Sequence, residues 1–350
     1  KLRNSSGGDL LWIHSDNPSN IFLGLQAGRI NNAGGGGINN SLVGSSSGYS
    51  NGTGSNNTAT GLGTLYFNSS GTGNTANGVN SLTANTTGDW NTAGGFQALA
   101  FNSTGNNNTA NGYFSLYNNV AGSNATAIGY HAMRYANNIA TPFTNYNVAV
   151  GYESLRGSTT AADNTGNSNT AIGYQTLFNN STGFSNTANG RQSLYSNTGG
   201  DNNTAIGYQA LYDNTTGLNN TATGFQALFN NIDGDRNTAF GNSALLSNQA
   251  GNNGTAFGHG AMSLFNDQVS SFTNTNIAFG YEALRGSVSP AANDGYNNSA
   301  VGYQSLRNNS SGHQNTAMGY NSLYNNSTGN RNTAVGHLSL NESTTGSQNT

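Results

Sequence analysis

The sequence predicts an all-β protein, a parallel β-solenoid (β-roll) of about eighteen 17-residue coils. Three observations predict this class. One short sequence unit recurs along most of the chain. No apolar stripe with a helical period of 3.6 residues is present. The composition, with 50 glycines and only 33% hydrophobic residues, suits a thin coil better than a thick globular core.

The repeat unit is clearest at 203–219, "NTAIGYQALYDNTTGLN", which is followed by "NTATGFQALFNNIDGDR". Positions are numbered 1 to 17 from the first Asn of each copy. Looser copies begin at Asn20 and Asn40, and the chain closes on Asn349-Thr350, the first two letters of another copy. The other copies begin at residues 57, 74, 91, 108, 125, 147, 169, 186, 203, 220, 237, 254, 276, 298, 315 and 332.

Four of the copies are 22-residue units in place of 17-residue ones: those that begin at 125, 147, 254 and 276. The pair of long copies recurs with a 129-residue period, so a block (147–275 and onward) has been duplicated as a whole. Such duplication is tolerated when each unit contacts mainly its neighbours, as in a solenoid. The array is predicted to span 20–350 and to continue beyond it, with the additional residues of the long copies in surface loops.

Residues 1–19 do not fit the repeat, and they are predicted to form an N-terminal cap or a junction. Solenoids need caps that cover the open end of the first coil. Trp12 and Ile13 are the apolar candidates for this role.

Three small or apolar positions define the predicted core. Position 3 is Ala in nearly every copy, position 5 is Gly, and position 9 is Leu or Met from the third copy onward. Positions 3 and 5 share one side of a strand, so another backbone is expected to pass close to them, with Leu filling the remaining gap. The representative core residues are Ala171, Gly173, Leu177, Ala205, Gly207 and Leu211.

Each copy is therefore predicted to contain a strand at positions 1–5, a bend at 6–7, a second strand at 8–11 and a turn at 12–17. Asn at position 12 and Gly at position 15 are typical of a type I β-turn. Stacked coils would place like residues above one another, so the Asn at position 1 is expected to form an amide ladder.

Two kinds of outward column are expected. Position 4 is polar in the early copies and mostly Ile, Val, Phe or Met later, which indicates packing against another chain. Positions 6 and 10 are mostly aromatic. Stacking that stabilises the coil edges is the favoured interpretation, and a contact surface for glycans or host molecules is the functional one. The candidate contact residues are Tyr174, Tyr208, Tyr212, Phe225, Tyr303 and Tyr320.

The turns contain N-x-S/T sequons in one column. Turn chemistry alone explains these residue types. If the source glycosylates Asn, however, they would carry an exposed row of sugars. The candidates are Asn68, Asn85, Asn102, Asn180, Asn214, Asn309 and Asn326.

Motifs for catalysis are weak. The G-x-S-x-G match at 44–48 lacks the following helix that a nucleophile elbow needs. The four glycines at 34–37 lack a helix and a lysine for phosphate. The five histidines have no ligand spacing, and the acidic turn at Asp233 and Asp235 lacks a calcium-repeat pattern. No catalytic, cofactor or metal site is expected, and the chain is predicted not to be an enzyme.

Two acidic residues, Glu153 and Glu282, occupy the same position in two related long copies. Each is expected to form a weak surface ion pair with an arginine three residues on, Arg156 or Arg285. A catalytic carboxylate pair would need a pocket, which nothing in the sequence predicts.

Charge and composition exclude several function classes. Net charge is -3, and ten basic residues are spread along the chain, so clustered phosphate contacts to nucleic acid are not expected. No apolar run reaches the roughly 20 residues of a membrane span. The absence of Cys removes disulfides and thiol chemistry. No signal peptide is recognisable, and Lys1 is expected to start a mature or excised segment.

The unit "NTAIG", followed by a turn and a second short strand, resembles the head repeats of trimeric autotransporter adhesins (YadA-like heads) and the repeats of tail-fibre-like proteins. The resemblance covers roughly 20–350 and is carried by the A-x-G core, for example at 171–173 and 205–207. It implies a left-handed β-roll that assembles as a trimer. The coils of those heads are shorter, and the family's anchor and stalk are not in this sequence.

The sequence thus favours a structural segment of an extracellular or cell-surface fibre or adhesin, a rod for attachment or spacing that associates with itself. One alternative is a filament whose subunits join end to end. Another is a solenoid that binds glycans, or that binds ice through the threonines of position 2.

Overall fold

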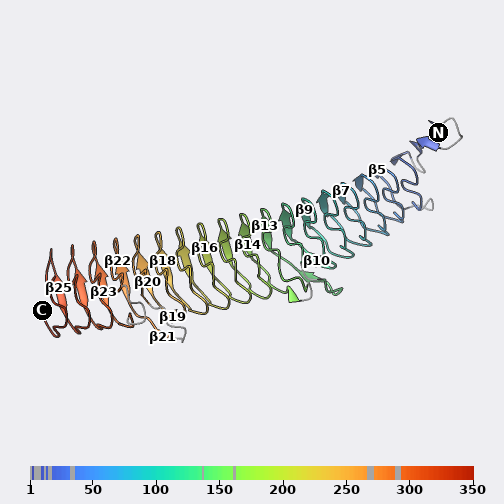
Figure 1. Ribbon diagram of the computed structural model, residues 1–350. Helices are drawn as coiled ribbons and strands as arrows, with labels where there is room; N and C mark the ends of the chain where they lie inside the picture. The colour runs from blue at the N-terminus through green and yellow to red at the C-terminus, as the bar shows by residue number, and fades with distance from the viewer. Residues whose placement is uncertain are drawn as a thin grey trace. The chain divides into compact units, whose positions relative to one another are not determined.

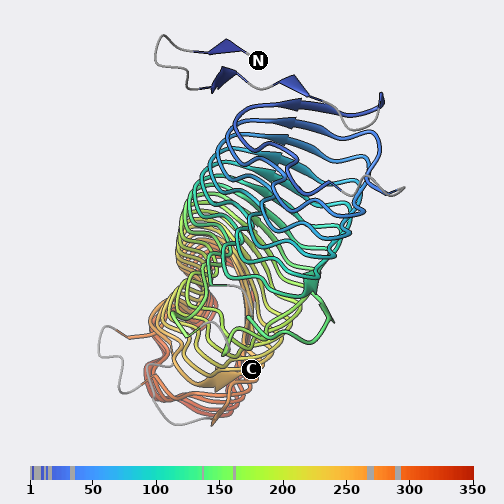
Figure 2. The same cartoon turned by 90° about the vertical axis from the view of Figure 1, so that its right-hand side faces the viewer.

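The computed structural model describes residues 2–3, 9–11, 13–14, 18–31, 36–135, 138–160, 163–265, 272–287 and 293–350. The chain divides into two compact units, unit 1 (Lys1–Tyr174) and unit 2 (Gln175–Thr350), and each is described by itself. Within each unit the coils lie side by side (Figure 1), and Figure 2 shows the coils of unit 1, blue to green, lying one on the next.

In unit 1, each coil contributes one strand to a parallel sheet, and neighbouring strands come from consecutive coils. The sheet strands are β4 (Ile21–Leu23), β5 (Ser41–Val43), β6 (Thr58–Thr60), β7 (Thr75–Asn77), β8 (Thr92–Gly94), β9 (Thr109–Asn111), β11 (Thr126–Ile128), β13 (Val148–Val150) and β14 (Thr170–Ile172).

The start of unit 1 departs from the parallel pattern. Strand β3 (Ile13–His14) pairs antiparallel with β4, and β1 (Leu2–Arg3) pairs antiparallel with β2 (Asp9–Leu11). Backbone pairing of β3 with β4 therefore extends the sheet past the strand of the first coil, at the end where a cap was predicted. Trp12, the other predicted cap residue, lies outside the described residues.

Unit 2 repeats the same parallel arrangement with consecutive coils paired in register. Its sheet strands are β15 (Thr187–Asn189), β16 (Thr204–Ile206), β17 (Thr221–Thr223), β18 (Thr238–Phe240), β20 (Thr255–Phe257), β22 (Ile277–Phe279), β23 (Ser299–Val301), β24 (Thr316–Met318) and β25 (Thr333–Val335).

The register places like positions above one another. Thr204, Ala205 and Ile206 pair with Thr221, Ala222 and Thr223 of the next coil. Because side chains alternate along a strand, the central Ala is buried and its two neighbours point outward. No α-helix occurs in the described residues. The predicted all-β parallel solenoid is confirmed, and like positions of standard coils pair at the expected 17-residue spacing.

The predicted second strand at positions 8–11 is wrong. Positions 5, 7 and 9 all have positive φ, as at Gly207 (134°), Gln209 (53°) and Leu211 (52°), so the chain runs through successive turns. Hydrogen bonds between coils continue nonetheless. The N–H of Gln209 donates to the carbonyl of Arg191 in the preceding coil, and the N–H of Leu211 donates to Ala227 in the following one.

A leucine whose backbone lies in the left-handed region is destabilising, because a non-glycine residue in such a conformation costs about 1–3 kcal/mol. The same conformation recurs at position 9 along the described coils, and the inter-coil hydrogen bonds and side-chain burial hold it there. This conformation is therefore set by the stack of coils and not by local preference.

The interior is both apolar and polar. Ala205 and Leu211 are fully buried, and so are Asn203 and Asn214, at positions 1 and 12. The side-chain N–H groups of both asparagines donate to the carbonyl of Gly217, which closes the corner of the coil. The corner at 214–217, where Asn and Gly predicted a turn, is closed by these side-chain hydrogen bonds.

The main amide ladder lies at position 12. The Nδ2 of Asn214 donates to Asn197 Oδ1 at 2.8 Å, and the Nδ2 of Asn231 donates to Asn214 Oδ1 at 2.8 Å. At position 1, the column predicted to form the ladder, the side-chain oxygen instead accepts a backbone N–H, as from Asn220 to Asn203. Some position-1 pairs also make the expected amide contact, such as Asn108 to Asn91.

The long copies carry extra structure at the surface, as predicted. Residues 138–142 are exposed, and β12 (Phe143–Thr144) pairs parallel with β10 (Gly122–Ser123). The equivalent pair in unit 2 is β21 (Phe272–Thr273) with β19 (Gly251–Asn252). The duplication seen in the sequence therefore appears as the same pairing in each unit.

Candidate contact surface

The outward column at position 4 presents apolar side chains on the face of each sheet. In unit 2, Phe240, Phe257 and Phe279 stack with ring centroids 5.7 and 5.5 Å apart. Phe240 and Phe279 remain 50% and 57% exposed. The other exposed members are Ile128 and Ile172 in unit 1, and Ile206, Val301, Met318 and Val335 in unit 2.

This face carries no formal charge in the described coils, because positions 2 and 4 hold only Thr, Ser, Asn, Gly and apolar residues. Removing water from an uncharged face costs little free energy, and burying a row of exposed Phe, Ile and Val is favourable. It is therefore chemically suited to contact with another surface of the same kind.

The aromatic column at position 6 runs beside it, past the Gly of position 5. In unit 1 it holds Phe96, Tyr113, Tyr130, Tyr152 and Tyr174, with neighbouring centroids 5.0–5.3 Å apart and planes within 13°. In unit 2 the run His259, Tyr281, Tyr303, Tyr320 and His337 has spacings of 5.1–5.2 Å.

Parallel stacking has a direct consequence for ligand binding. Each ring covers the face of the next, so only edges and hydroxyl groups point outward. Sugar rings bind aromatic side chains through an open ring face, and this column has faces covered by neighbouring rings. The stacking that was the favoured interpretation therefore accounts for these side chains.

The position-10 column is more enclosed. Phe178, Tyr195, Tyr212 and Phe229 stack at 5.0–5.1 Å within unit 2. The pKa of Tyr212 is raised mainly by burial, and to a smaller extent by the nearby Tyr195 and Asp213. Burial also raises the pKa of the Asp213 carboxyl beside it.

The structure divides the six predicted contact residues between the two columns. Tyr212 belongs to position 10 and is half-buried, and the other five belong to position 6. Tyr208 stacks on Phe225 at 5.1 Å and lies under the guanidinium of Arg191 at 5.7 Å. The exposed members are Tyr174, Phe225, Tyr303 and Tyr320. The predicted core residues Ala171, Leu177, Ala205 and Leu211 are fully buried, whereas Gly173 and Gly207 are partly exposed.

The expectation of an exposed row of sequon asparagines is wrong. All seven side chains are buried, and they form the position-12 ladder described above. At Asn214 the amide nitrogen already donates to Asn197 and Gly217, and its oxygen accepts from Asn231. A sugar on this nitrogen has no room inside the coil. The packing of the corner therefore explains the Asn of these sequons.

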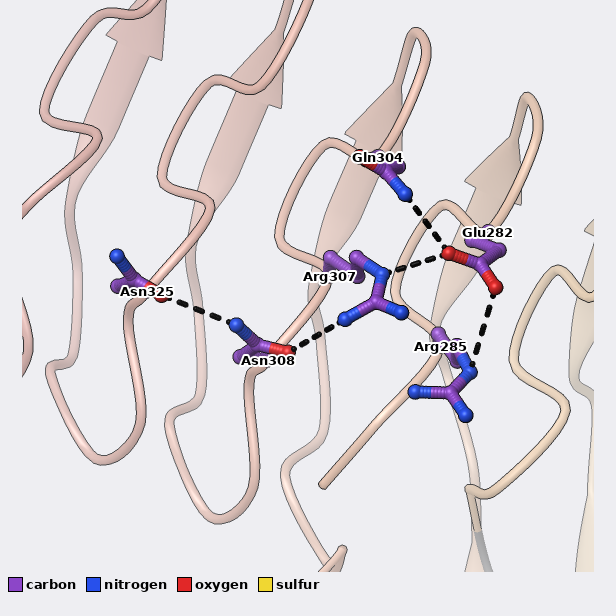
Figure 3. A network of polar contacts seen from close by, with 6 residues as sticks. All are labelled: Glu282, Arg285, Gln304, Arg307, Asn308 and Asn325. Atoms are coloured by element: carbon purple, nitrogen blue, oxygen red, sulfur yellow. Dashed lines mark hydrogen bonds and ion pairs between the residues drawn. The ribbon is translucent and has the colours of Figure 1, made fainter. Parts of the chain in front are cut away.

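The ion pairs form as expected, and one is extended by a contact that the sequence did not reveal. Glu282 lies 3.6 Å from Arg285, its predicted partner. A second arginine, Arg307 of the next coil, donates through Nε to Glu282 Oε2 at 2.6 Å, and Gln304 donates to the same oxygen at 2.8 Å (Figure 3). Arg307 also donates to Asn308, whose amide continues to Asn325.

This network sets the ionisation of Glu282. Burial alone would raise its pKa, but hydrogen bonds from Arg307 and Gln304 and the charges of Arg307 and Arg285 outweigh burial and lower it. The partner responds in the opposite sense, since Glu282 raises the pKa of Arg307 despite its burial. Arg307 follows Glu282 by one long coil plus three positions, so the repeat period was the signal that could have found the pair.

The matching site in unit 1 is built differently. Glu153 lies 3.6 Å from Arg156 and 3.9 Å from the ring of His131. Burial, with Arg134 nearby, lowers the pKa of His131, and Glu153 opposes this shift. The guanidinium of Arg134 packs over Phe114, 4.9 Å from the ring centroid.

The described side chains of the remaining histidines stack on tyrosines. His259 and His337 belong to the position-6 column, and His313 stacks on Tyr296 at 4.9 Å. The side chain of His14 lies outside the described residues.

The other sequence motifs considered for catalysis or ligand binding are parts of the coil backbone and its turns. Ser46, in the G-x-S-x-G match, is part of a turn with φ of 56°, and its N–H donates to Leu25. Asp235 accepts the backbone N–H of Leu218 at 2.8 Å. In the part of the chain that the structure describes, no three His, Cys, Asp or Glu side chains are grouped for a metal. An open depression of about 450 Å³ is lined by Phe101, Asn118, Val120 and Asn138. Of the four glycines of 34–37, two lie outside the described residues.

Comparison with known proteins yields no family. No protein-family model matches the chain, and no curated protein matches it. Among the described residues, no helix is long and apolar enough to span a membrane.

Proposed function

We propose that this chain is a structural segment of an extracellular or cell-surface fibre or adhesin, a repetitive rod that associates with copies of itself along the position-4 column. One observation carries the proposal: an uncharged strand face with Phe240 and Phe279 half or more exposed to solvent. Exposed apolar rows of this kind mark surfaces that bind other proteins.

A second copy is the partner that fits this face best. The apolar side chains recur once per coil, at the ~4.8 Å spacing of hydrogen-bonded strands. A partner must keep the same spacing to stay in register over many coils, and another copy of this chain does so. The face carries no charge, so like copies do not repel one another there.

The resemblance to trimeric adhesin heads adds the expectation of a left-handed trimer. The role as an extracellular spacer without catalytic activity rests on that resemblance and on the Cys-free, weakly charged composition. Self-association is the part that a single experiment on the purified chain can test.

The test is the mass in solution by light scattering, with imaging by negative-stain electron microscopy. A trimer has a mass near three times 36.0 kDa. A mass of one chain contradicts self-association. Long ordered polymers would favour the end-to-end filament, and thermal hysteresis would favour ice binding.

The surface is tested with Phe240→Asn/Phe279→Asn, since the coil already accepts Asn at position 4 in Asn189. The double variant should have a lower mass than the parent chain at equal concentration. Ile232→Thr is the matched control, because it removes an exposed apolar side chain at position 13, where Thr215 occurs naturally. An assembly that survives the double variant uses another surface.

A further inference from the structure

Several tyrosines lie in continuous ladders within single units. Tyr130, Tyr152 and Tyr174 in unit 1 have ring centroids 5.0 and 5.2 Å apart. Tyr281, Tyr303 and Tyr320 in unit 2 are spaced by 5.1 Å at both steps. Rings in each pair lie within 9° of parallel, and each pair joins two consecutive coils.

We propose that these ladders are sites of oxidative dityrosine cross-linking between neighbouring coils of one chain. The inference goes beyond the structural role proposed above and does not depend on it. Tyr152 and Tyr303 are 43% and 44% exposed, so an oxidant can reach their outer edges while the stack keeps the partner ring in contact.

The reaction needs a one-electron oxidant, for which a haem peroxidase with hydrogen peroxide is the class proposed. Each of two tyrosines loses one electron and its phenolic proton to become a phenoxyl radical. The radicals join through a carbon–carbon bond between ring carbons ortho to oxygen, and the two ring hydrogens replace the phenolic ones through solvent. The peroxide takes up two electrons and two protons to give two molecules of water.

Proximity is what the fold supplies to this reaction. Two rings held in contact react in an intramolecular step. The effective concentration of the second ring is then orders of magnitude higher than for partners that must meet by diffusion. A phenol with the ordinary tyrosine pKa of 10.0 is protonated near neutral pH, and the neighbouring Glu153 carboxylate raises the pKa of Tyr152 further, so its oxidation releases a proton with the electron.

Such bonds would reinforce the coils where disulfides cannot, because the chain contains no Cys. A bond between Tyr130 and Tyr152 closes one long coil, and a bond between Tyr303 and Tyr320 closes one standard coil. Each link holds two coils together by a covalent bond in addition to their hydrogen bonds.

The chain itself contains matched controls. Tyr208 lies in the same column, but it stacks on Phe225, which cannot couple in this way. Tyr146 is 60% exposed, and no described ring stacks on it. If exposure alone decided coupling, Tyr146 would be the preferred site.

The experiment treats the full chain with peroxidase and peroxide, measures dityrosine fluorescence, and maps linked peptides by mass spectrometry. Equal amounts of ¹⁵N-labelled and unlabelled chain are mixed first, so that links within one chain carry a single isotope. The expected products join consecutive ladder tyrosines, such as Tyr281 to Tyr303, each with the loss of two hydrogen atoms and a single isotope. Any products of Tyr146 or Tyr208 should include the mixed-isotope form at the half share that links between chains give.

Tyr152→Phe completes the test, since Phe occupies this column naturally at Phe96 and Phe225. The variant should lose both unit 1 products of Tyr152 without a new bond from Tyr130 to Tyr174, and the unit 2 products should be unchanged. Coupling at Tyr146 or Tyr208 as frequent as in the ladders would overturn the proposal, as would ladder products of which half carry mixed isotopes, the share given by links between chains, or oxidation without coupling. None of these readouts depends on the oligomeric mass.

Discussion

Leu42 fills the space that a side chain on Gly48 would need: a Cβ added to Gly48 would lie 2.5 Å from Leu42 Cδ1. These residues occupy positions 3 and 9, where the standard coil has a small residue and a large one, Ala205 and Leu211. The loose copy thus reverses the order of sizes and fills the same interior. Gly48 has a φ of 55°, close to the 52° of Leu211, so the backbone already has the shape that Leu adopts there.

This relationship predicts a strong coupling between the two positions. Leu42→Ala alone should destabilise its coil by about 2–5 kcal/mol through lost burial and a cavity. Gly48→Leu alone should cost about 1–3 kcal/mol or more through overpacking. Combined, the two changes restore the standard core, and the double variant should be more stable than either single one.

Hydrogen exchange at the amides of 40–56 is the suitable measurement, because coils of a solenoid can open separately. A double-mutant cycle gives the coupling energy. Additive effects of the two substitutions would contradict the shared space.

Gly207 is predicted to be intolerant of any side chain. Its Cβ would lie 2.4 Å from the carbonyl oxygen of Gly224, and its φ is 134°. Gly336 has a similar φ of 121°, but nothing lies within 4 Å of an added Cβ. Gly336→Ala therefore incurs only the backbone cost, about 1–3 kcal/mol.

Gly207→Ala should be clearly worse than Gly336→Ala, because it adds a clash with backbone that cannot move without breaking the register. Urea unfolding followed by circular dichroism would compare the two variants. Equal losses would show that conformation alone, and not close approach, requires glycine at position 5.

Asn214→Ala is predicted to weaken the amide ladder. The substitution removes the acceptor of Asn231 and a donor to Asn197 in a buried row, which should cost about 1–3 kcal/mol. Thr216→Ala is the control, since Thr216 is exposed on the same corner. Amide exchange in the coils on either side should rise for the first variant only; an equal rise in both would assign the effect to the corner and not to the ladder.

Acid should weaken the contact of Glu282 with the next coil. Because the folded-state pKa of Glu282 is lowered from its ordinary value of 4.5, its contribution to stability is present above that value. The contribution is lost as the pH falls through the folded-state pKa. Glu282→Gln should remove this part of the acid dependence.

Arg307→Gln tests the cause of the shift. Without Arg307, burial of Glu282 should dominate and raise its pKa, so that the coil becomes more stable as the pH falls through the range just above 4.5. Carbon-13 NMR of the Glu282 carboxyl across pH would compare Arg307→Gln with the parent chain, and urea unfolding across pH would follow Glu282→Gln. A pKa that stays low in Arg307→Gln would mean that Gln304 and Arg285 are sufficient.

Much of the fold follows from the repeat itself. The strand at Thr204–Ile206, the close approach at Gly207 and the outward row containing Phe240 were all predictable, because residue size and alternation at a fixed period indicate which side of a strand faces inward. The surface loops of the long copies were predictable for the same reason. They interrupt the period without disturbing the units on either side.

Other features of the structure could not be predicted from the repeat pattern. Leu211 has a conformation that leucine avoids locally, so the pattern "ALY" suggested a strand where the chain turns. Asn214 carries a sequon and a turn residue type, which suggested exposure, yet it is buried and fully hydrogen-bonded. Arg285, three residues from Glu282, was predicted from local spacing, whereas Arg307 would have required the repeat period to be followed into the next coil.

The sequence by itself therefore determined the coil length, the strand of each coil, and the small and large residues of its interior. Those features depend on side-chain size and on the order of residues within one unit. The tertiary structure decided the positive φ angles at positions 7 and 9, the burial of the asparagine ladder and the contacts of Glu282 with Arg307 and Gln304. Each of these depends on hydrogen bonds and contacts with the adjacent coil, which exist only once one unit is stacked in register on the next.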